Sequence, residues 1–380
     1  MTTRIDDDWL RSAATQTVMG LLAEAGHLAL AVGGCVRNAL LGVPVSDIDI
    51  ATDARPDRVL ALAEVAKIRA IPTGIDHGTV TLVVDGVPYE ITTFRRDVET
   101  HGRHATVAFS DDPGTDAGRR DFTMNALYAD RDGLVVDPLG GLPDLRARHV
   151  RFIGDPGARI TEDYLRILRF FRFTAWYGDP DLGLDAEGLA ACAAHQEGLD
   201  TLSRERVGHE LRKLLAAPDP APEVASMAQS GILARILPGA DPTALGPLIH
   251  LGETDWLARL ATLGGDASHL RLSKQETKTL HDLATSARDG TDPFTLGDTL
   301  GPRAIDALMI RAAFLGEPLE PGAIDEARQG VEQAFPVTAA DLMPDLQGPE
   351  LGQALARART LWRQRKGAID KRSLIQAAKA

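Results

Sequence analysis

Three features are scarce in this chain of 380 residues: cysteine, aromatic side chains and long apolar segments. The two cysteines, Cys35 and Cys192, are too few for a disulfide framework or a cysteine metal site. Aromatic residues make up 5% of the chain, so the core must be built mostly from Leu, Ala, Val and Ile. No apolar run approaches the roughly 18 residues of a membrane-spanning helix, and the N-terminus has no apolar signal region. We therefore expect a soluble, cytoplasmic protein without a membrane partner.

Positive charge is also scarce overall. The net charge is −13, which argues against a general binder of polyanions. The last stretch, residues 357–380, is the exception, because Asp370 is its only acid among many basic residues. These basic residues are Arg357, Arg359, Arg363, Arg365, Lys366, Lys371, Arg372 and Lys379. A basic end on an acidic protein indicates either a nucleic-acid contact or a solvated helix face, and the sequence leaves both open.

The stretch from Leu28 to Asp53 carries the most chemistry. Leu28 to Val32 is a short apolar run that predicts a strand, and a Gly-Gly pair then breaks it. Val36 to Leu41 is typical of one or two helical turns. Ser46 to Ala51 alternates polar and apolar residues, which predicts a half-buried strand.

Two carboxylates lie on that second strand. Asp47 and Asp49 are two residues apart, so we expect both on the polar face, with Ile48 and Ile50 buried behind them. Two close anions repel unless a cation lies between them, and oxygen ligands on a rigid strand suit Mg²⁺. The alternative is an ordinary strand with a solvent-facing pair of aspartates.

A phosphate site is expected beside these carboxylates. The Gly-Gly turn leads into the predicted helix, where backbone N–H groups at the helix start bind phosphate, and Arg37 on that helix adds a bidentate donor. A phosphate cradle next to a metal-binding carboxylate pair indicates phosphoryl or nucleotidyl transfer.

A third carboxylate is predicted in the same sheet. Asp85-Gly86 separates two runs of strand-forming residues and predicts a hairpin, which places Glu90 in the middle of a strand. Glu90 would then be available to the metals, or would be a plain exposed residue. Arg95 to Thr115 is polar and predicts a long mobile loop. Gly118 to Tyr128 predicts the start of a helix that carries Arg120.

A second cluster lies on a predicted helix from Thr161 to Phe173, with Thr161 as its N-cap. Asp163 and the three arginines Arg166, Arg169 and Arg172 recur at every third position and share one side of that helix. They form either surface ion pairs with neighbouring acids or contacts with a nucleotide.

Asp163 and Arg166 together suggest a way to choose a base. A carboxylate accepts and a guanidinium donates, and cytosine and adenine both present an amine donor beside a ring-nitrogen acceptor. Guanine and uracil present the reverse pattern. A pair held one helical turn apart would therefore accept CTP and ATP and reject GTP and UTP.

At this point the chain resembles the bacterial class II tRNA nucleotidyltransferase (CCA-adding enzyme) and poly(A) polymerase family. The resemblance covers roughly the first 215 residues, in the family's order. The segments that carry it are Gly33–Arg37 with Asp47–Asp49, Arg119–Ala126, Asp137–Asp144, Glu162–Arg169 and Ser203–Glu210.

The resemblance implies an α+β fold, with a nucleotidyltransferase head of mixed β-sheet and helices followed by all-α domains. The implied domains are a catalytic head at 1–145, a neck for base recognition at 146–215, a helical body at 216–320 and a tRNA-binding tail at 321–380. It also implies that residues 95–110 form a flexible loop that couples nucleotide choice to growth of the RNA end.

The resemblance further implies roles for the metal and phosphate residues. Asp47 and Asp49 would bind two Mg²⁺ ions and serve catalysis, with Glu90 as a further carboxylate near the site. Gly34 and Arg37 would hold the triphosphate.

The remaining implied roles concern the nucleotide. Arg120 would contact it, and Asp163 and Arg166 would read its base. Arg169 and Arg172 would support these residues or bind phosphate.

The function that the resemblance implies is template-independent addition of CCA to tRNA 3′ ends from CTP and ATP. A poly(A) polymerase or a partial CC- or A-adding enzyme on the same scaffold is the nearest alternative. An inactive RNA-binding factor is the third, and the presence of Asp47, Asp49 and Arg120 argues against it. The sequence carries no signal for an oligomeric state.

Overall fold

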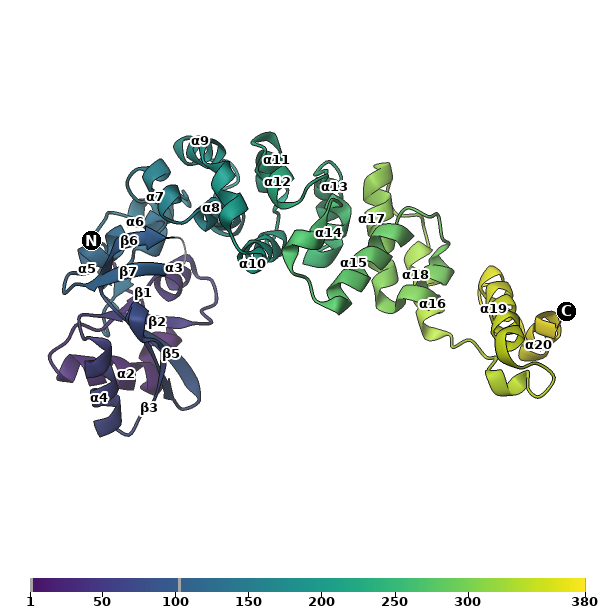
Figure 1. Ribbon diagram of the computed structural model, residues 1–380, viewed down its shortest axis with the longest axis horizontal. Coiled ribbons are helices and arrows are strands. Elements are labelled where there is room, and N and C mark those ends of the chain that lie inside the picture. The colour runs from purple at the N-terminus through teal and green to yellow at the C-terminus, as the bar shows by residue number, and fades with distance from the viewer. Residues whose placement is uncertain (1–2, 102–103, 380) are drawn as a thin grey trace. The chain divides into compact units, whose positions relative to one another are not determined.

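The computed structural model describes residues 3–101 and 104–379, with side chains described outside 97–106. The chain forms two compact units, which follow one another along the ribbon in Figure 1. Unit 1 consists of residues 1–210 and 230–232, and unit 2 of residues 211–229 and 233–380. The boundary falls within helix α10 (Arg204–Leu215). Division into four domains stays a prediction.

Unit 1 is built around a seven-stranded sheet with the order β3-β4-β5-β2-β1-β8-β9. Strands β2 and β5 run parallel, and the other neighbouring strands in this sheet run antiparallel. The strands are β1 (Leu30–Val32), β2 (Ile48–Thr52), β3 (Arg69–Gly74), β4 (Thr79–Val84), β5 (Val87–Thr93), β8 (Tyr128–Ala129) and β9 (Val135–Val136). Mixed pairing of this kind, with helices in the same unit, agrees with the expected α+β class.

Helices α2 and α4 pack against strands of this sheet and close its core. Val18, Met19 and Leu22 of α2 are fully buried, because they recur at helical spacing along one face. The α-helices that precede α10 are α1 (Asp8–Arg11), α2 (Ala13–Glu24), α3 (Gly34–Leu41), α4 (Pro56–Val65), α5 (Pro113–Gly118), α6 (Leu142–Arg146), α7 (Pro156–Glu162), α8 (Leu165–Tyr177) and α9 (Ala186–Ala194).

Strand β2 lies at the centre of the sheet, and its burial pattern differs from the predicted alternation of buried and exposed residues. The sequence predicts strict alternation, and the structure confirms a buried Ile50 next to a half-buried Asp49. Ala51 and Thr52 are both buried, however, and Ile48 is only half-buried. A central strand is covered on both faces, so the alternation is confined to the end of the strand that reaches the polar edge.

The predicted hairpin is confirmed. Strands β4 and β5 pair from Thr79 with Thr92 to Val84 with Val87. Asp85 (φ 53°) and Gly86 (φ 81°) make the turn between them. Positive φ at both central residues is the requirement of a type I′ turn, which explains the Asp-Gly pair.

The prediction of a long loop after β5 is wrong. Residues 95–101 and 104–109 form a two-stranded ribbon, β6 (Arg95–His101) and β7 (His104–Phe109), and α5 follows. Gly102 and Arg103, which the loop prediction includes, lie outside the described residues. A ribbon outside the main sheet need not bury one face, so its polar sequence lacks the alternation that identifies a strand.

The helix predicted to begin near Gly118 is also wrong. Gly118 ends α5, and residues 123–125 form a single 3₁₀ turn, η2 (Thr123–Asn125). Asp121 accepts hydrogen bonds from the backbone N–H of Phe122 (2.9 Å) and from the side chain of Asn125 (3.0 Å). These bonds hold a tight turn in place of a helix.

The continuous helix predicted from Thr161 to Phe173 is broken into α7 and α8. The N-cap of α7 is Asp155, which accepts from the N–H of Ala158 at 2.7 Å, and Thr161 lies in the last turn. Asp163 is extended (φ −154°, ψ 105°), and its carboxylate accepts from the N–H of Leu165 at 3.1 Å. The aspartate thus competes with the backbone for hydrogen bonds, which ends one helix and begins the next.

Among its described residues, unit 2 contains helices and no strands. Its α-helices after α10 are α11 (Ala221–Gln229), α12 (Ile232–Ile236), α13 (Leu245–His250), α14 (Trp256–Leu263), α15 (Lys274–Ser286), α16 (Pro293–Leu300), α17 (Ala304–Leu315), α18 (Ala323–Glu332), α19 (Gly348–Gln364) and α20 (Lys371–Lys379), although Ile232 itself is grouped with unit 1. Within the described residues, no helix is long and apolar enough to cross a membrane.

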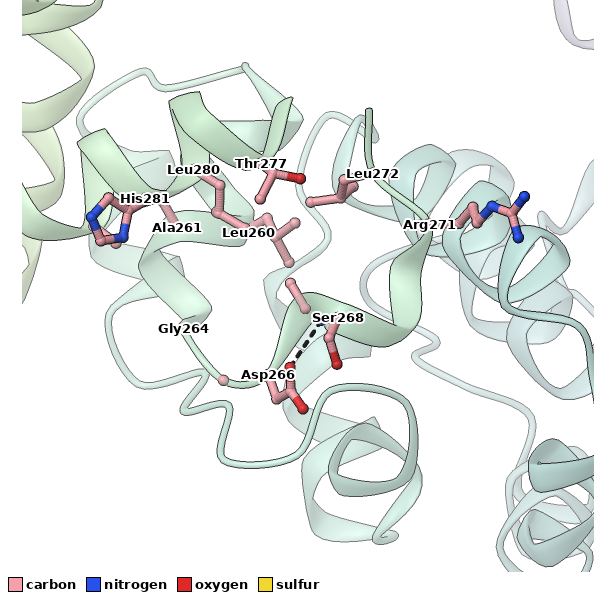
Figure 2. A pocket seen from close by; sticks show the side chains of 13 residues that line it. Leu260, Ala261, Gly264, Asp266, Ser268, Arg271, Leu272, Thr277, Leu280 and His281 are labelled. Atoms are coloured by element: carbon pink, nitrogen blue, oxygen red, sulfur yellow. Dashed lines mark hydrogen bonds between the residues drawn. The ribbon is translucent and has the colours of Figure 1, made fainter. Parts of the chain in front are cut away.

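Unit 2 also contains a pocket of about 560 Å³, open to solvent, beside α14 and α15. Leu260, Leu272 and Leu280 line it, and Figure 2 shows the side chain of Arg271 pointing away from these leucines. None of the site residues predicted from the sequence lines this pocket.

Candidate active site

The candidate site begins at the glycine turn between β1 and α3. Gly33 has φ 71° and ψ −117°, a conformation that only glycine adopts readily. Its N–H donates to the carbonyl of Leu127 at 3.1 Å, which ties the turn to the strand next to β1. Gly34 is the first residue of α3, so the N–H groups of the first helical turn are presented there. The turn therefore has the backbone geometry of a phosphate site.

The carboxylates lie on the two parallel central strands. Asp47 is exposed and immediately precedes β2, and Asp49 is half-buried within it. Glu90 is exposed on β5 and is the direct register partner of Asp49. The three acidic residues predicted to share a site therefore lie on or directly before two adjacent strands of the sheet.

These neighbours perturb Asp49. The pKa of Asp49 is raised to about 6. Burial is the largest cause, the charges of Glu90 and Asp47 act in the same direction, and the positive charge of Arg120 opposes the shift. A carboxylate held among like charges favours either a proton or a cation. Among the described residues there is no group of three or more His, Cys, Asp or Glu side chains placed to hold a metal ion. The assignment of Asp47 and Asp49 as metal ligands stays a prediction.

Arg120 reaches the glycine turn from the opposite side. A Cβ added to Gly33 would lie 3.3 Å from Nη1 of Arg120. Nε and Nη2 of Arg120 donate to the buried Asp116 at 3.3 and 3.0 Å, and Nε also reaches the hydroxyl of Tyr128 at 3.3 Å. Although burial alone would lower the pKa of Arg120, the charge of Asp116 raises it. Asp116 thus fixes a permanent cation beside the turn.

Arg37 is the second arginine at the turn. Its exposure is only 6%, and a Cβ added to Gly34 would lie 3.8 Å from its Nη2. The guanidinium donates to the amide oxygens of Asn38 and Asn125 and to the hydroxyl of Tyr177 (2.8 Å). All of these acceptors are neutral. Burial lowers the pKa of Arg37, and its charge is left uncancelled by any direct partner.

The arginines of α8 have different partners. Arg169 is paired with Asp121, with its Nε 2.7 Å from the carboxylate, and Nε of Arg172 donates to Glu210 at 2.6 Å. Both carboxylates are buried. Burial would raise the pKa of Asp121, but the charge of Arg169 and the hydrogen bonds from Asn125, Arg169 and the N–H of Phe122 together lower this pKa to about 2. These two arginines therefore form buried ion pairs.

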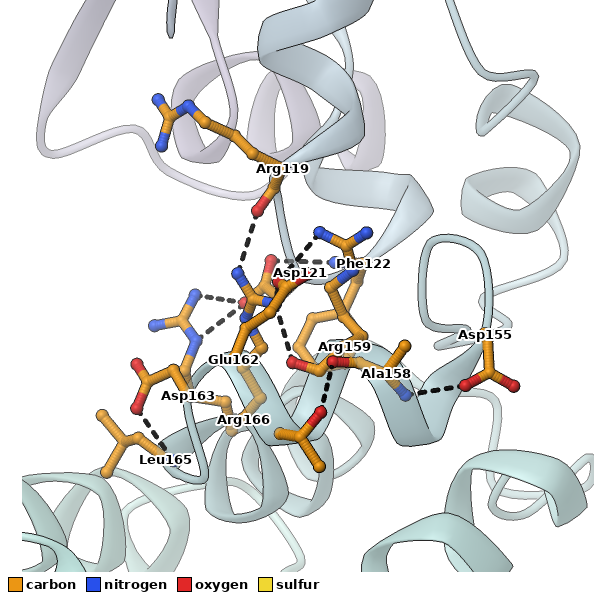
Figure 3. Close-up of polar contacts among 12 residues, drawn as sticks. Arg119, Asp121, Phe122, Asp155, Ala158, Arg159, Glu162, Asp163, Leu165 and Arg166 are labelled. Atoms are coloured by element: carbon orange, nitrogen blue, oxygen red, sulfur yellow. Dashed lines mark hydrogen bonds and ion pairs between the residues drawn. The ribbon is translucent and has the colours of Figure 1, made fainter. Parts of the chain in front are cut away.

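Arg166 and Asp163 lie at the junction of α7 and α8, shown in Figure 3. Arg166 pairs with Glu162 at 2.5 Å and donates to the carbonyl oxygens of Arg159 (2.8 Å) and Arg119 (2.9 Å). Asp163 accepts from Nη2 of Arg206, on α10, at 2.6 Å. The expected ion pair with a neighbouring acid is thus present for Arg166. Asp163 and Arg166 are not one helical turn apart on a single helix, because the backbone is extended at Asp163.

Several residues of this network escape sequence reasoning. Asn125 and Tyr177 bind Arg37 from distant parts of the chain, and Asp116 binds Arg120 from four residues away. Asp121 and Glu210 belong to segments that carry the family resemblance, but the sequence does not predict that they pair with Arg169 and Arg172. Tyr177 gives no signal, since a tyrosine at the end of an apolar helix is typical of a core residue.

Comparison with known proteins agrees with this geometry. The family described as the poly A polymerase head domain matches residues 29–151, and the family described as the probable RNA and SrmB-binding site of polymerase A matches residues 181–243. The CCA-adding enzyme of Geobacillus thermodenitrificans is 35% identical over 330 residues, which cover 80% of each chain. The human mitochondrial CCA tRNA nucleotidyltransferase 1 is 32% identical over 391 residues, which cover 94% of this chain and 88% of that one.

A solved structure shares the whole fold. The crystal structure of the Bacillus stearothermophilus CCA-adding enzyme in complex with CTP aligns with a TM-score of 0.77 and 26% identity, covering 96% of this chain and 97% of that one. The fold and the matched head domain define an enzyme of the nucleotidyltransferase class. Within that class, the chain belongs to the family of CCA-adding tRNA nucleotidyltransferases. The expected family and the α+β fold with helical domains are thereby confirmed.

Proposed function

We propose that this chain adds C, C and A to the 3′ end of tRNA, using CTP and ATP, by metal-dependent nucleotidyl transfer. The observation that carries the proposal is the convergence of two cations on one glycine turn. Arg120 approaches Gly33 and Arg37 approaches Gly34, while Asp49 and Glu90 lie on the neighbouring strands. Cations at a helix start suit a triphosphate, and nearby carboxylates suit the cation that accompanies it.

Asp47 and Asp49 would hold Mg²⁺. Two carboxylates are a fitting set for this ion, which usually takes one or two protein carboxylates and completes its shell with water and substrate phosphates. The raised pKa of Asp49 supports the assignment, because a neighbouring cation would relieve the same repulsion. Bound there, Mg²⁺ would activate the RNA 3′-hydroxyl and neutralise the leaving pyrophosphate. Glu90 would act through its charge on Asp49.

Gly34, Arg37 and Arg120 would bind the triphosphate. The N–H groups at the start of α3 suit a phosphate group. The guanidinium of Arg37 adds a positive charge, because its hydrogen-bond acceptors are neutral. Arg120 keeps Nη1 directed toward the turn while Asp116 holds its other nitrogens. A polyanion placed at the turn would therefore satisfy both cations.

Asp163 and Arg166 would read the base. Arg166 has five N–H donors, and its three bonds to Glu162 and to two carbonyl oxygens leave two of them for a base edge. Each carboxylate oxygen of Asp163 makes one bond and retains a lone pair for an exocyclic amine. The pair can thus accept cytosine or adenine without giving up its present contacts. Arg169 and Arg172 would support this arrangement.

We propose that the basic C-terminal segment contacts the tRNA through only some of its basic residues. Most of its cations are paired within unit 2: Arg359 and Arg363 with Asp298, Lys366 with Glu326, Lys371 with Asp341, and Lys379 with Asp345. Arg357 donates to the carbonyl of Ala378. In the described part of the chain, Arg365 and Arg372 have no such partner, so we assign them the contact with phosphates. A cytoplasmic location stays a prediction.

The test is incorporation of single nucleotides into tRNA that lacks its 3′ end. CTP alone should add two residues, ATP should then add one, and growth should stop. Long tails from ATP alone would support the poly(A) polymerase alternative, and addition that stops after CC would support a partial enzyme. No incorporation with Mg²⁺ and both nucleotides would leave the inactive RNA-binding factor.

A further inference from the structure

Arg37 lies over two aromatic rings at the C-terminal end of α8. Its guanidinium carbon is 4.0 Å from the ring centroid of Tyr177 and 5.1 Å from that of Phe173. Phe173 and Tyr177 are one helical turn apart, and their ring centroids are 5.4 Å apart. The hydroxyl of Tyr177 also accepts a hydrogen bond from Nη2 of Arg37 at 2.8 Å. One tyrosine thus contacts the same guanidinium with both its ring and its oxygen.

We propose that Tyr177 is a positioning residue that holds Arg37 for the triphosphate, an inference that rests on the proposed function. The partners of Arg37 decide the argument. Asn38, Asn125 and Tyr177 are neutral acceptors, so they fix the guanidinium without cancelling its charge. A carboxylate in the same place would hold the group equally well but would compete with phosphate for it.

Burial makes this support necessary. The arginine is 6% exposed, so little water is present to satisfy its N–H groups when no nucleotide is bound. A cation over an aromatic face gains attraction as it is desolvated. Phe173 is itself contacted by three guanidinium groups, since Arg169 and Arg172 lie 5.2 and 4.5 Å from its centroid. Tyr177 is therefore the aromatic partner dedicated to Arg37 among these two rings.

The same helix also carries Arg166 near its other end. Because α8 is one helix, Tyr177 and Arg166 keep a fixed separation. A nucleotide bound by both Arg37 and Arg166 would then have its base read by α8 and its phosphates held by an arginine of α3 that α8 positions. Tyr177 would then set where the triphosphate lies relative to the base.

The experiment compares Tyr177→Phe, which removes only the hydroxyl, with Tyr177→Leu, which removes the ring as well. Trp176→Phe is the control, since Trp176 is the neighbouring residue on α8 and is 40% exposed. We expect the KM for CTP and for ATP to rise about fivefold in Tyr177→Phe and about 30-fold in Tyr177→Leu. The KM for tRNA should change less than about twofold in both, and the control should match the wild type.

A double-mutant cycle with Arg37→Met separates positioning from a general structural effect. If Tyr177 acts through Arg37, Tyr177→Phe should raise the KM for CTP no further when Arg37→Met is already present. An equal rise in both backgrounds would overturn the inference, as would an unchanged KM in Tyr177→Phe alone. Arg37→Met with an unchanged KM would instead contradict the triphosphate site itself. If Tyr177→Leu fails to fold, Tyr177→Phe and the cycle still decide.

Discussion

Two groups of arginines in this chain differ in what balances their charge. Arg169 and Arg172 of α8 each face a buried carboxylate, Asp121 and Glu210 respectively. Arg37 of α3 is buried and is held by amide oxygens, a hydroxyl and two rings. Among these three arginines, the two with a carboxylate of their own contribute to the fold, whereas Arg37, held by neutral groups, keeps its charge for a ligand. Arg120 combines both situations, because Asp116 holds its Nε and Nη2 while its Nη1 lies near the glycine turn.

The largest effect is expected at the carboxylates. Asp49→Asn should reduce nucleotide incorporation by about a thousandfold or more, because the Mg²⁺ site loses a ligand. The same change should not lower the thermal unfolding temperature at neutral pH. Asp49 has a raised pKa, so its charged form is disfavoured in the folded protein and a neutral amide removes that cost. Incorporation assays and thermal unfolding check the two parts, and full activity in the variant would contradict the metal assignment.

Removing a carboxylate that pairs with an arginine of α8 should lower the stability of the fold. Asp121→Asn leaves the buried side of Arg169 unpaired, and we expect a loss of about 2 kcal/mol in the free energy of unfolding at neutral pH. The folded pKa of Asp121 is depressed to about 2, so this stability is present above the ordinary pKa near 4 and is lost as the pH falls toward 2. Urea unfolding of the wild type and the variant across this range checks it. Equal acid sensitivity of both proteins would count against the pair.

The sequence predicts the local features of the site but not its long-range contacts. The spacing of Asp47 and Asp49 and the Gly33-Gly34 turn are local patterns, so strand period and glycine chemistry suffice to place them. The break at Asp163 was missed, because an aspartate inside an amphipathic pattern gives no sign that its side chain will cap the next helix. Tyr177 was missed for another reason: its contact with Arg37 spans 140 residues and depends on how α8 packs against α3.

The pH dependence of the metal requirement should separate Asp49 from its neighbour Glu90. The pKa of Asp49 is raised to about 6, and Mg²⁺ needs the ionised form. The Mg²⁺ concentration for half-maximal activity should be steady above about pH 7 and rise about tenfold per pH unit below pH 6. Glu90→Gln removes a charge that raises this pKa, so it should move the rise to lower pH. An unshifted profile in Glu90→Gln would contradict the coupling.

The smallest effects are expected in the basic C-terminal segment. Arg365→Ala and Arg372→Ala should each weaken tRNA binding about threefold and reduce the slope of log affinity against log salt by about one. Arg359→Ala is the matched control, because Arg359 pairs with Asp298 and should affect stability without changing the salt slope. Salt titrations of tRNA binding measure all three. A reduced slope in the control alone would reverse the assignment.

The central claim is that Arg37 keeps its charge for the triphosphate while Arg172 does not. Calorimetric binding of CTP and CMP to the wild type, Arg37→Met and Arg172→Met tests it most directly. We predict that Arg37→Met weakens CTP binding at least about tenfold and CMP binding little, and that Arg172→Met weakens both nucleotides alike. Equal losses for CTP and CMP in Arg37→Met, or a loss specific to CTP in Arg172→Met, would contradict the account.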